Sequence, residues 1–347
     1  MGSSRTARQT PTSFEATEAA TPVDEVDRIA ASLQGAQRIL VTTHPHPDGD
    51  AAGSLSAALQ ALFALGKDAV GYNPDPIPQR FRFMRCLDGV LQELPKGDFD
   101  LTLVLDCTDE RMFGGDAPKE RLGTVVALDH HKTEGDFAEL ILRDPDAASA
   151  GVVLHRVLER LEVPLDLPMA EALYCSLISD TGSFRYQNTN PEAMRLGAKL
   201  LEVGVDPWRV ASNLYESQSR GQLELLGEVL RTLEVCADGR LAILEVTHEM
   251  MAHHGCNKGH VDGFINYGRG IEGVEVAALL RVGPSDLRVS LRSRGQVDVS
   301  ALAARFGGGG HHNAAGFTVE AGARDRIVAE LVEAAGQVCS QKGQGRG

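Results

Sequence analysis

Acidic and histidine side chains gather at three points of this 347-residue sequence, each directly after a short apolar run. The three clusters are His44, Asp48 and Asp50; Asp106; and Asp129, His130 and His131. Carboxylate and imidazole together suit divalent ions such as Mn²⁺, whereas the thiolate ligands that soft metals prefer are missing from these clusters. Two such ions about 3.5–4 Å apart can activate a water and stabilise a leaving oxygen in phosphoryl transfer. The residue types therefore predict a two-metal centre that hydrolyses phosphate esters.

The apolar runs before these clusters are typical of buried strands, over residues 38–44, 100–107 and 124–131. An Ala- and Leu-rich helix is expected over residues 51–66, and a further strand over 68–72. Strands that alternate with helices predict an α/β fold with a doubly wound, mostly parallel sheet. Because the carboxyl ends of parallel strands border the ligand crevice, the three clusters should converge in space.

Two later helices are expected over residues 149–161, with Ser149 as the N-cap, and over 168–184. The second of these helices runs into a polar turn, and Asp180 at that point can join the three clusters. Four aspartates, Asp48, Asp50, Asp106 and Asp180, would then lie together. Unpaired, they would repel and raise one another's pKa values, and two divalent cations would cancel that charge.

Each cluster alone has a simpler interpretation. The HPHPDGD stretch can be an ordinary turn, Asp106 can cap a helix over residues 108–112, and Asp180 can cap a turn. The Asp-His-His stretch can be a solvated loop. Their occurrence together, in this order and each after an apolar element, favours the metal centre. His46 has the weaker claim to a metal. A metal contact by His130 does not imply one by His131, since adjacent side chains on an extended strand point to opposite sides.

The second half of the chain predicts a different kind of domain. Residues 206–224 are polar, carry the only Trp and predict a linker with some helix, after which residues 225–338 alternate as in a smaller α+β domain. Its strands are expected over residues 240–247, 274–282 and 287–293, and a closing helix over 325–338. The polar N-terminus, residues 1–22, is expected to be disordered, and residues 339–347 to form a frayed tail.

A run of four glycines at residues 307–310 interrupts this domain. Glycine permits close backbone approach to a ligand, and successive N–H groups, such as those of Gly308, Gly309 and Gly310, can form an anion-binding nest. A flexible linker is the alternative interpretation. Basic residues that can contact phosphate, or can equally belong to a solvated surface, are Arg292 and Arg294, with Arg269 and Arg185 as weaker candidates.

Bulk properties narrow the function classes. The formal net charge of −14 argues against a surface for long nucleic acid, whose affinity comes largely from phosphate neutralisation. No two of the six cysteines are spaced as CxxC, which predicts a reducing, cytoplasmic location without a thiol–zinc site. No apolar run reaches 18 residues, so we expect no membrane-spanning helix, and the N-terminus lacks the apolar core of a signal peptide.

The motif order resembles that of the DHH phosphoesterases over about residues 24–338. The resemblance rests on H-x-x-x-D-x-D, the strand-end Asp, D-H-H and a later Asp-Thr-Gly-Ser, and on GGGGHHNAAGF at residues 307–317, which is similar to the loop of the DHH-associated C-terminal domain. Within the family, length and domain order most resemble oligoribonucleases that also remove the 3′-phosphate of 3′-phosphoadenosine 5′-phosphate (pAp). The resemblance implies a catalytic domain over 23–205 and a substrate-binding domain over 225–338.

The resemblance also implies roles for individual residues. One metal, most often Mn²⁺ with Mg²⁺ or Co²⁺ as alternatives, would be held by His44, Asp48 and Asp106. The other would be held by Asp50, Asp106, His130 and Asp180. Asp129 would orient the site, and His131 would stabilise the scissile phosphate or donate a proton. The C-terminal loop would grip the substrate through His311, whereas a contact by His312 stays open.

Several other functions share these motifs. A RecJ-type single-strand exonuclease needs a long basic groove with stacking aromatics, which this acidic chain with 5% aromatic residues does not favour. A phosphodiesterase for cyclic or linear dinucleotides, an inorganic pyrophosphatase and a nucleotide-binding regulator without turnover are further alternatives. Short RNA or DNA oligonucleotides, pAp and dinucleotides are therefore the expected partners, with no membrane and with a homodimer as an open alternative.

Overall fold

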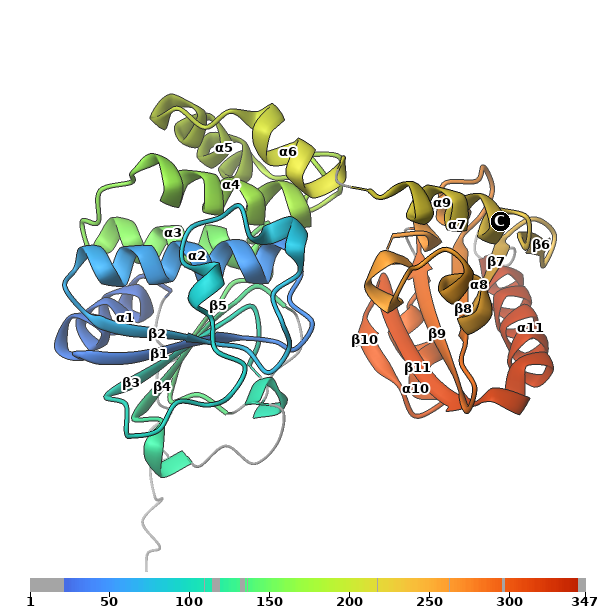
Figure 1. Cartoon of the computed structure of the whole chain (residues 1–347), viewed down its shortest axis with the longest axis horizontal. Coiled ribbons are helices and arrows are strands. Elements are labelled where there is room, and N and C mark those ends of the chain that lie inside the picture. The colour runs from blue at the N-terminus through green and yellow to red at the C-terminus, as the bar shows by residue number, and fades with distance from the viewer. Residues whose placement is uncertain are drawn as a thin grey trace, which may run out of the picture. The chain divides into compact units, whose positions relative to one another are not determined.

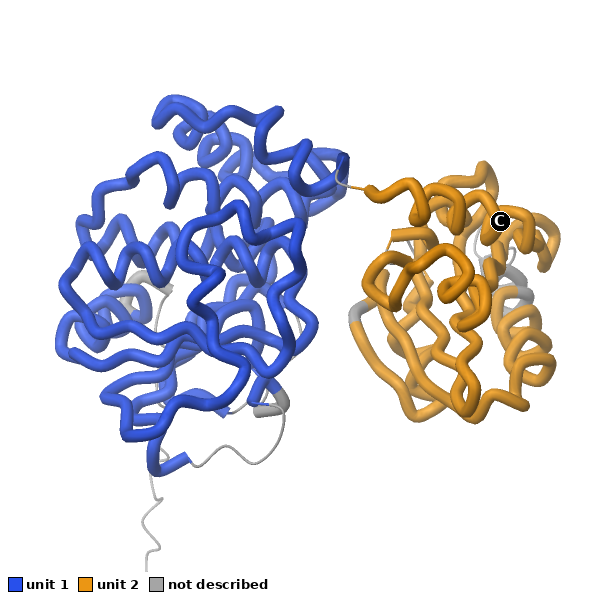
Figure 2. The backbone as a smooth tube through the Cα atoms, in the orientation of Figure 1, with its two compact units in different colours: residues 1–217 blue, residues 218–347 orange. Residues whose placement is uncertain are grey.

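The chain folds into two compact units, residues 1–217 and 218–347 (Figure 2). The computed structural model describes residues 22–108, 110–113, 119–131, 135, 137–216, 218–261, 263–294 and 297–342. The expected disorder of the N-terminus falls on residues outside this set, apart from Pro22, at which the first helix begins.

The first unit is built on a five-stranded sheet (Figure 1). Its strands are β1 (Arg38–Thr43), β2 (Asp68–Tyr72), β3 (Leu101–Leu105), β4 (Thr124–Asp129) and β5 (Leu140–Arg143). All neighbours are parallel, in the order β2-β1-β3-β4-β5. The chain moves from β1 to one side and returns to β3 on the other, so the sheet has its switch point between β1 and β3. Ligands bind at such a point, beyond the carboxyl ends of the strands.

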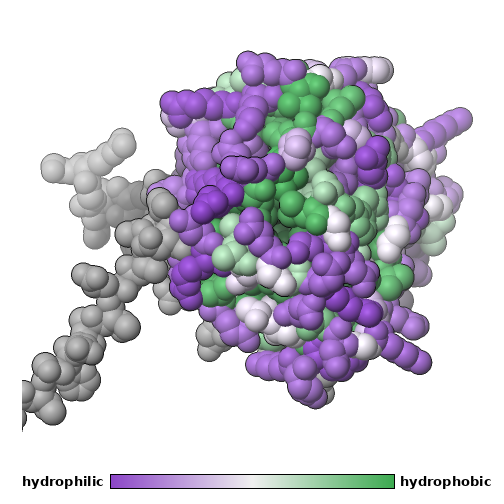
Figure 3. Space-filling view, turned by 90° about the vertical axis from the view of Figure 1, so that its left-hand side faces the viewer, coloured by the Kyte–Doolittle hydropathy of each residue, from purple (hydrophilic) through white to green (hydrophobic). Residues whose placement is uncertain are grey.

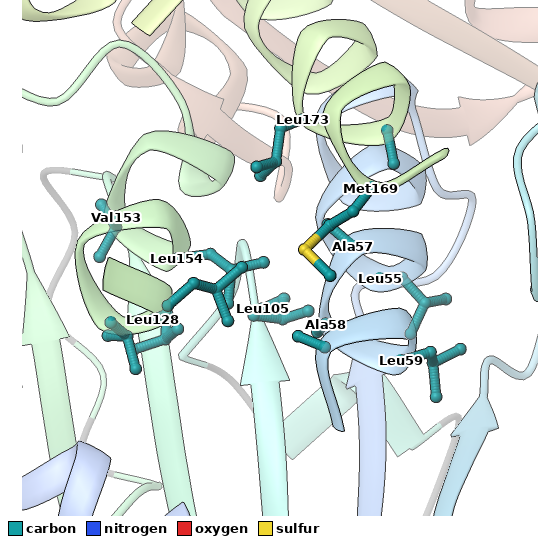
Figure 4. Close-up of a cluster of buried hydrophobic side chains, with 14 of the residues drawn as sticks. Leu55, Ala57, Ala58, Leu59, Leu105, Leu128, Val153, Leu154, Met169 and Leu173 are labelled. Carbon is teal, nitrogen blue, oxygen red and sulfur yellow. The ribbon is translucent and has the colours of Figure 1, made fainter. Parts of the chain in front are cut away.

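Helices cover one face of this sheet in layers. They are α1 (Pro22–Gly35), α2 (Gly49–Ala64), α3 (Ala150–Arg160), α4 (Leu167–Asp180), α5 (Pro191–Val203) and α6 (Pro207–Tyr215). Figure 4 shows Leu105 and Leu128 of the strands meeting apolar side chains of α2, α3 and α4, such as Leu55, Leu154 and Met169. The expected α/β class with a parallel sheet is confirmed.

The opposite face of the sheet has a core of its own. Leu40, Val104 and Ala127 pack there against Met112 and Phe113. Among the residues that the structure describes, this cover comes from the 3₁₀ turn Glu110–Phe113 and from loop residues such as Phe99 and Leu122, instead of α-helices. The two faces of the sheet are therefore covered by different kinds of element. Apolar side chains cover both faces, as is usual for a parallel sheet.

The second unit is a six-stranded mixed sheet with helices, which confirms the expected smaller α+β domain. Its strands are β6 (Glu234–Cys236), β7 (Leu241–Thr247), β8 (Val276–Val282), β9 (Asp286–Ser293), β10 (Gly309–His311) and β11 (Ala314–Glu320), in the order β10-β11-β9-β8-β7-β6. Its helices are α7 (Arg220–Leu230), α8 (His248–His253), α9 (Ile265–Arg269), α10 (Val299–Ala304) and α11 (Arg324–Lys342). One face of this sheet packs against α10 and α11. On the other face, β7 and β8 pack against α7, α8 and α9.

Two segments contain more helix than the sequence predicted. Residues 206–224, predicted as a linker with some helix, hold α6 and the first part of α7, which Asp206 and Ser219 cap, and the division between the two units falls within them. Residues 339–342 continue α11, whereas 343–347 lie outside the described set. Ser149 caps α3 as expected, since its hydroxyl accepts the N–H of Val152.

The surface gives no sign of a membrane-spanning segment in the part of the chain that is described. No described helix has the length and apolar character that a crossing requires. The face drawn in Figure 3 carries hydrophilic side chains at its margin, with apolar side chains exposed between them.

Helices α2 and α4 approach so closely that glycine is required between them. A Cβ on Gly53 would lie 2.5 Å from the carbonyl oxygen of Ala172 and 2.7 Å from the backbone nitrogen of Ser176. Gly53→Ala should therefore lower the free energy of unfolding by about 1–3 kcal/mol, as overpacking does. Urea denaturation measures this change.

Gly35→Ala is the matched control, because nothing lies within 4 Å of the added Cβ. It should leave stability within about 1 kcal/mol of the wild type. Equal effects of the two substitutions would show that α2 and α4 do not need this close approach.

Candidate metal centre

The register of the parallel sheet brings the three clusters into one row. Thr43 pairs with Leu105, and Leu105 pairs with Leu128, so the residues that follow each of them end neighbouring strands. Neighbouring strands lie about 4.8 Å apart. His44, Asp106 and the Asp129 segment therefore meet at the β1–β3 switch point, where the fold places ligands.

Asp106 lies at the centre of this row. It is 4% exposed, and its two oxygens face different histidines: Oδ2 is 3.4 Å from His44 Nε2, and Oδ1 is 3.3 Å from His130 Nε2. Oδ1 is buried without a hydrogen-bond partner. A buried oxygen without a partner is costly, and a cation held between carboxylate and imidazole would satisfy it. The donor set thus fits a carboxylate that bridges two ions.

A first ligand group joins His44, Asp48 and Asp106, whose ligand atoms lie within 4.8 Å of one another. Asp48 caps α2, because its Oδ1 accepts the backbone N–H groups of Asp50 and Ala51 at 3.0 and 3.1 Å. The residue types suit a divalent ion, and His44 and Asp48 are both partly exposed. The HPHPDGD stretch therefore caps a helix and supplies two residues of a candidate ligand group.

A second ligand group joins Asp50, His130 and Asp180. His130 Nε2 lies 3.5 Å from Asp50 Oδ2 and 3.6 Å from Asp180 Oδ2. Asp180 ends α4 and is held from the side by Asn188, whose amide contacts both its backbone and its side-chain oxygen. This group lies deeper than the first, because Asp50 is fully buried.

Four donors hold the Asp50 carboxylate in place. Oδ2 accepts the backbone N–H of Ala150 at 2.7 Å, at the start of α3. Oδ1 accepts the N–H of Gly151 at 3.2 Å and the hydroxyls of Ser54 and Ser176 at 3.1 and 2.6 Å. A helix N-terminus stabilises an anion in this way. Oδ2 is thus the oxygen with room for a further partner on the His130 side.

Burial and charge shift the pKa values of these groups strongly. Burial alone would lower the pKa of both histidines, but the nearby carboxylates outweigh it and raise the pKa of His44 to about 10 and of His130 to about 11. Burial raises the pKa of Asp50, and it raises the pKa of Asp180 to about 7. Burial acts the same way on Asp106, but His130 and His44 hold its pKa well below its usual range. A cation that binds here has to displace the imidazole protons.

Asp129 accepts hydrogen bonds from both members of the histidine pair. It is 1% exposed, and its Oδ1 accepts the ring Nδ1–H of His131 at 2.7 Å and the backbone N–H of His130 at 2.9 Å. Because the carboxylate can only accept, the proton of the neutral His131 ring sits on Nδ1. His131 Nδ1 also lies 3.6 Å from Asp106 Oδ1, so His131 belongs to a third possible ligand group with Asp106 and His130.

Two expected residues of the first unit lie apart from the ligand groups. His46 is half exposed, adopts a left-handed backbone with φ of 57°, and pairs with Asp75 through Nδ1 at 2.6 Å. Arg185 is exposed, and its Nε donates to the carbonyl oxygen of Gly182 at 2.6 Å. Neither belongs to any of the three groups of potential metal ligands among the described residues.

The glycine run of the second unit forms a hairpin. Gly309, in β10, pairs with Gly316 in β11. A Cβ on Gly308 would lie 2.2 Å from the carbonyl oxygen of Gly316, and Gly310 has φ of 143°. These contacts exclude larger side chains, and they argue against the flexible-linker interpretation.

The same sheet brings several basic candidates together. Arg292 in β9 pairs with Ala314, which in turn pairs with His311, so the three occupy one row of the sheet. Arg292 is partly buried, and Arg294 is exposed just beyond the strand. Arg269 ends α9, which packs on β8 and β9. His312 lies 3.7 Å from Asp298, and the side chain of His311 lies outside the described set.

The sequence analysis missed several residues that contact these groups: Ser54, Ser176, Asn188 and Arg143, whose Nε lies 3.6 Å from Asp129 Oδ2. Ser54 follows Asp50 by four residues, a spacing that places both on one face of a helix, so helical periodicity could have found it. The other three reach the site only through tertiary packing. Their types and spacing carry no signal in the sequence.

The geometry separates Asp106 from His46 as a test of the centre. Asp106→Ala removes the only carboxylate that faces both His44 and His130 among the described residues, so both ions should bind more weakly. We expect two manganese ions per wild-type chain, measured by elemental analysis after desalting, and fewer than one in this variant. His46→Ala should keep both ions, and equal metal content in the two variants would refute the bridging role.

Comparison with known proteins identifies the family of this chain. The family model for the DHH family, N-terminal domain, matches residues 38–177, and that for the DHHA1 domain matches residues 238–340. The chain is 32% identical over 312 residues to the bifunctional oligoribonuclease and PAP phosphatase NrnA of Thermus thermophilus, covering 88% of this chain and 91% of the relative. It is 25% identical over 302 residues to the Bacillus subtilis protein of the same name, covering 84% and 93%.

A solved structure agrees as well. The crystal structure of an exopolyphosphatase-related protein from Bacteroides fragilis matches with a TM-score of 0.78 and 26% identity, covering 85% of this chain and 90% of that one. The chain therefore belongs to the DHH family of metal-dependent phosphoesterases and carries the DHHA1 domain.

Proposed function

We propose that this protein hydrolyses short oligonucleotides to mononucleotides and removes the 3′-phosphate from pAp at one two-metal centre. The observation that carries the proposal is the buried Asp106 carboxylate, whose two oxygens face two different groups of ligands. The names of the Thermus thermophilus and Bacillus subtilis relatives support the substrate class. Both relatives match more than four-fifths of this chain, across both of its domains.

DHH phosphoesterases bind divalent ions, and we propose two Mn²⁺ here. His44, Asp48 and Asp106 would hold one ion, and Asp50, Asp106, His130 and Asp180 the other. The mixture of carboxylate and imidazole without thiolate supports manganese, with Mg²⁺ or Co²⁺ as substitutes. When bound, such a pair activates a water and stabilises charge on the leaving oxygen.

The remaining steps belong to side chains of the chain itself. Asp129 holds the Nδ1–H of His131. In the imidazolium form Nε2 also carries a proton, and we assign that Nε2–H to a phosphate oxygen, where it stabilises charge or donates the proton. Asp48 and Asp50 are held by helix N-termini and hydroxyls, which keeps both carboxylates in place as charge moves through the site. This preorganisation is the main contribution that the protein itself makes to the rate.

We assign substrate binding to the second domain, residues 225–338, and catalysis to the first, residues 23–205. Arg292, the glycine run Gly308, Gly309 and Gly310, and His311 would bind a phosphate, with Arg294, Arg269, Arg185 and His312 as weaker candidates. The N–H of Gly308 donates to the carbonyl oxygen of Ala303 at 3.0 Å, so a backbone contact with phosphate would have to come from Gly309 or Gly310. The support is the row that places Arg292 beside the β10–β11 hairpin. An arginine fork and backbone N–H groups both match phosphate oxygens.

We also propose a cytoplasmic location and a homodimer. Five cysteines of the described part carry free thiols, which supports a cytoplasmic location. Gel filtration with light scattering would test the homodimer.

Substrate length is the sharpest test of the proposed function. The chain has a net charge of −14, and its candidate phosphate contacts are few, so each further phosphate of a long strand would lack a partner. We expect kcat/KM to be highest for oligomers of about two to five nucleotides, with weak salt dependence. A length series at one manganese and salt concentration, with pAp, a cyclic dinucleotide and pyrophosphate alongside, measures this.

A steady rise of kcat/KM with strand length would replace the proposal with a single-strand exonuclease. A preference for pyrophosphate or for the cyclic dinucleotide would replace it with the corresponding hydrolase. Asp106→Ala should abolish the oligonucleotide and pAp activities together, because one centre serves both.

A second prediction concerns Arg292. Arg292→Ala should raise KM about tenfold or more and leave the metal content at two ions, because this residue lies in a different unit from every metal ligand. Leu223→Ala, at an exposed position of the same unit, is the control and should leave KM unchanged. Loss of metal in Arg292→Ala would contradict the division between the two domains.

A further inference from the structure

Arg143 lies at the carboxyl end of β5, next to the row formed by the ends of β1, β3 and β4. It is the last residue of β5, and its Cα pairs with that of Asp129 at the end of β4. The side chain is 17% exposed, and its Nε lies 3.6 Å from Asp129 Oδ2. The row of strand ends thus extends from Asp106 through Asp129 to the largely buried guanidinium of Arg143.

Two neighbours hold the guanidinium where it is. Its Nη2 donates to the hydroxyl of Thr108 at 3.2 Å and to the carbonyl oxygen of Gly135 at 3.4 Å. A Cβ on Gly135 would lie 2.3 Å from the carbonyl oxygen of Thr108, so glycine is what allows these two segments to meet beside Arg143. These contacts fix the fork, whose planar geometry a lysine cannot reproduce.

Asp129 divides its two oxygens between two tasks. Oδ1 faces the histidines, accepting the ring Nδ1–H of His131 and the backbone N–H of His130. Oδ2 faces Arg143. A buried carboxylate without a cation beside it is unfavourable, so without Arg143 the Asp129 side chain would rotate away from the position in which it holds His131. Within the described part of the chain, Arg143 is the arginine that lies within ion-pair distance of Asp129.

We propose that Arg143 is a positioning residue for catalysis, which keeps the Asp129 carboxylate oriented so that Asp129 can hold His131. The inference rests on the proposed function, because His131 matters only if a phosphate is hydrolysed beside it. The contacts of Arg143 described above include neither a candidate metal ligand nor a residue assigned to the substrate. Its effect reaches the reaction through Asp129.

The test begins with Arg143→Leu, which removes the charge and keeps much of the bulk. We expect kcat on a dinucleotide in manganese to fall about 10- to 100-fold, the usual loss when a residue that orients a metal-site histidine is disturbed. KM should change by less than about threefold, and elemental analysis should still find two ions. Arg143→Lys should recover part of kcat, because it restores the charge without the fork.

Arg156→Leu is the matched control. Arg156 is also a partly buried arginine of the first unit, paired with Asp144 at 2.7 Å and Glu192 at 2.5 Å, and both partners lie outside the ligand groups. We expect a lower melting temperature with kcat within about twofold of the wild type. A merely structural role for Arg143 would give the same pattern in Arg143→Leu, and that result would overturn the proposal.

A double-mutant cycle with Asp129→Asn tests the route of the effect. If Arg143 acts through Asp129, Arg143→Leu should change kcat by less than about twofold in the Asp129→Asn background. Effects that multiply would contradict the proposal. Should Arg143→Leu fail to fold, Arg143→Lys and the double variant, which removes both charges, still decide it. A wild type inactive on every substrate would refute the proposed function, and a fully active Arg143→Leu would refute only this inference.

Discussion

The concentration of negative charge at the β1–β3 switch point is the constraint on which the rest of the first unit depends. Asp50 and Asp106 are buried, and Asp48 and Asp180 lie beside them. Two unit charges 4 Å apart repel by about 4 kcal/mol even at an effective dielectric constant of about 20. A fold can keep such a cluster only by surrounding it with donors and cations. Those surroundings explain most of the local structure around the crevice.

Asp48, Asp50, Asp106 and the neighbouring Asp129 each have their own compensation. Asp48 receives the N-terminus of α2, and Asp50 receives the N-terminus of α3 together with two serine hydroxyls. Asp106 faces two histidines, and Asp129 faces His131 on one side and Arg143 on the other. Helix N-termini carry partial positive charge, so both helices begin where that charge is needed. The close approach of α2 and α4 at Gly53 then brings Ser176 within reach of Asp50.

The sequence predicted what depends on residue type and strand position. Apolar runs that end in Asp or His located β1, β3 and β4, and the parallel α/β class followed from their alternation with helices. Strands β5, β6, β10 and β11 were not predicted. The first three have only three or four residues, and β11 begins in the Gly- and Ala-rich GGGGHHNAAGF stretch. Polar positions hid α6 and α7, whose apolar stripes are narrow. The contacts of Asp50 with α3 and of Asp129 with Arg143 join segments about 100 and 14 residues apart, for which a single sequence holds no signal.

All candidate metal ligands among the described residues lie between residues 44 and 180, so the first unit contains the charge cluster and the groups that compensate it. The hairpin and Arg292 of the second unit belong to none of the ligand groups. Under the proposed function, a change in the second unit would act on phosphate binding, and a change in the first would act on the metal centre itself. Arg143 lies in the first unit but belongs to neither class, because its partner Asp129 is itself not in a ligand group. Its importance would come from a carboxylate that needs a cation on one side in order to hold a histidine on the other.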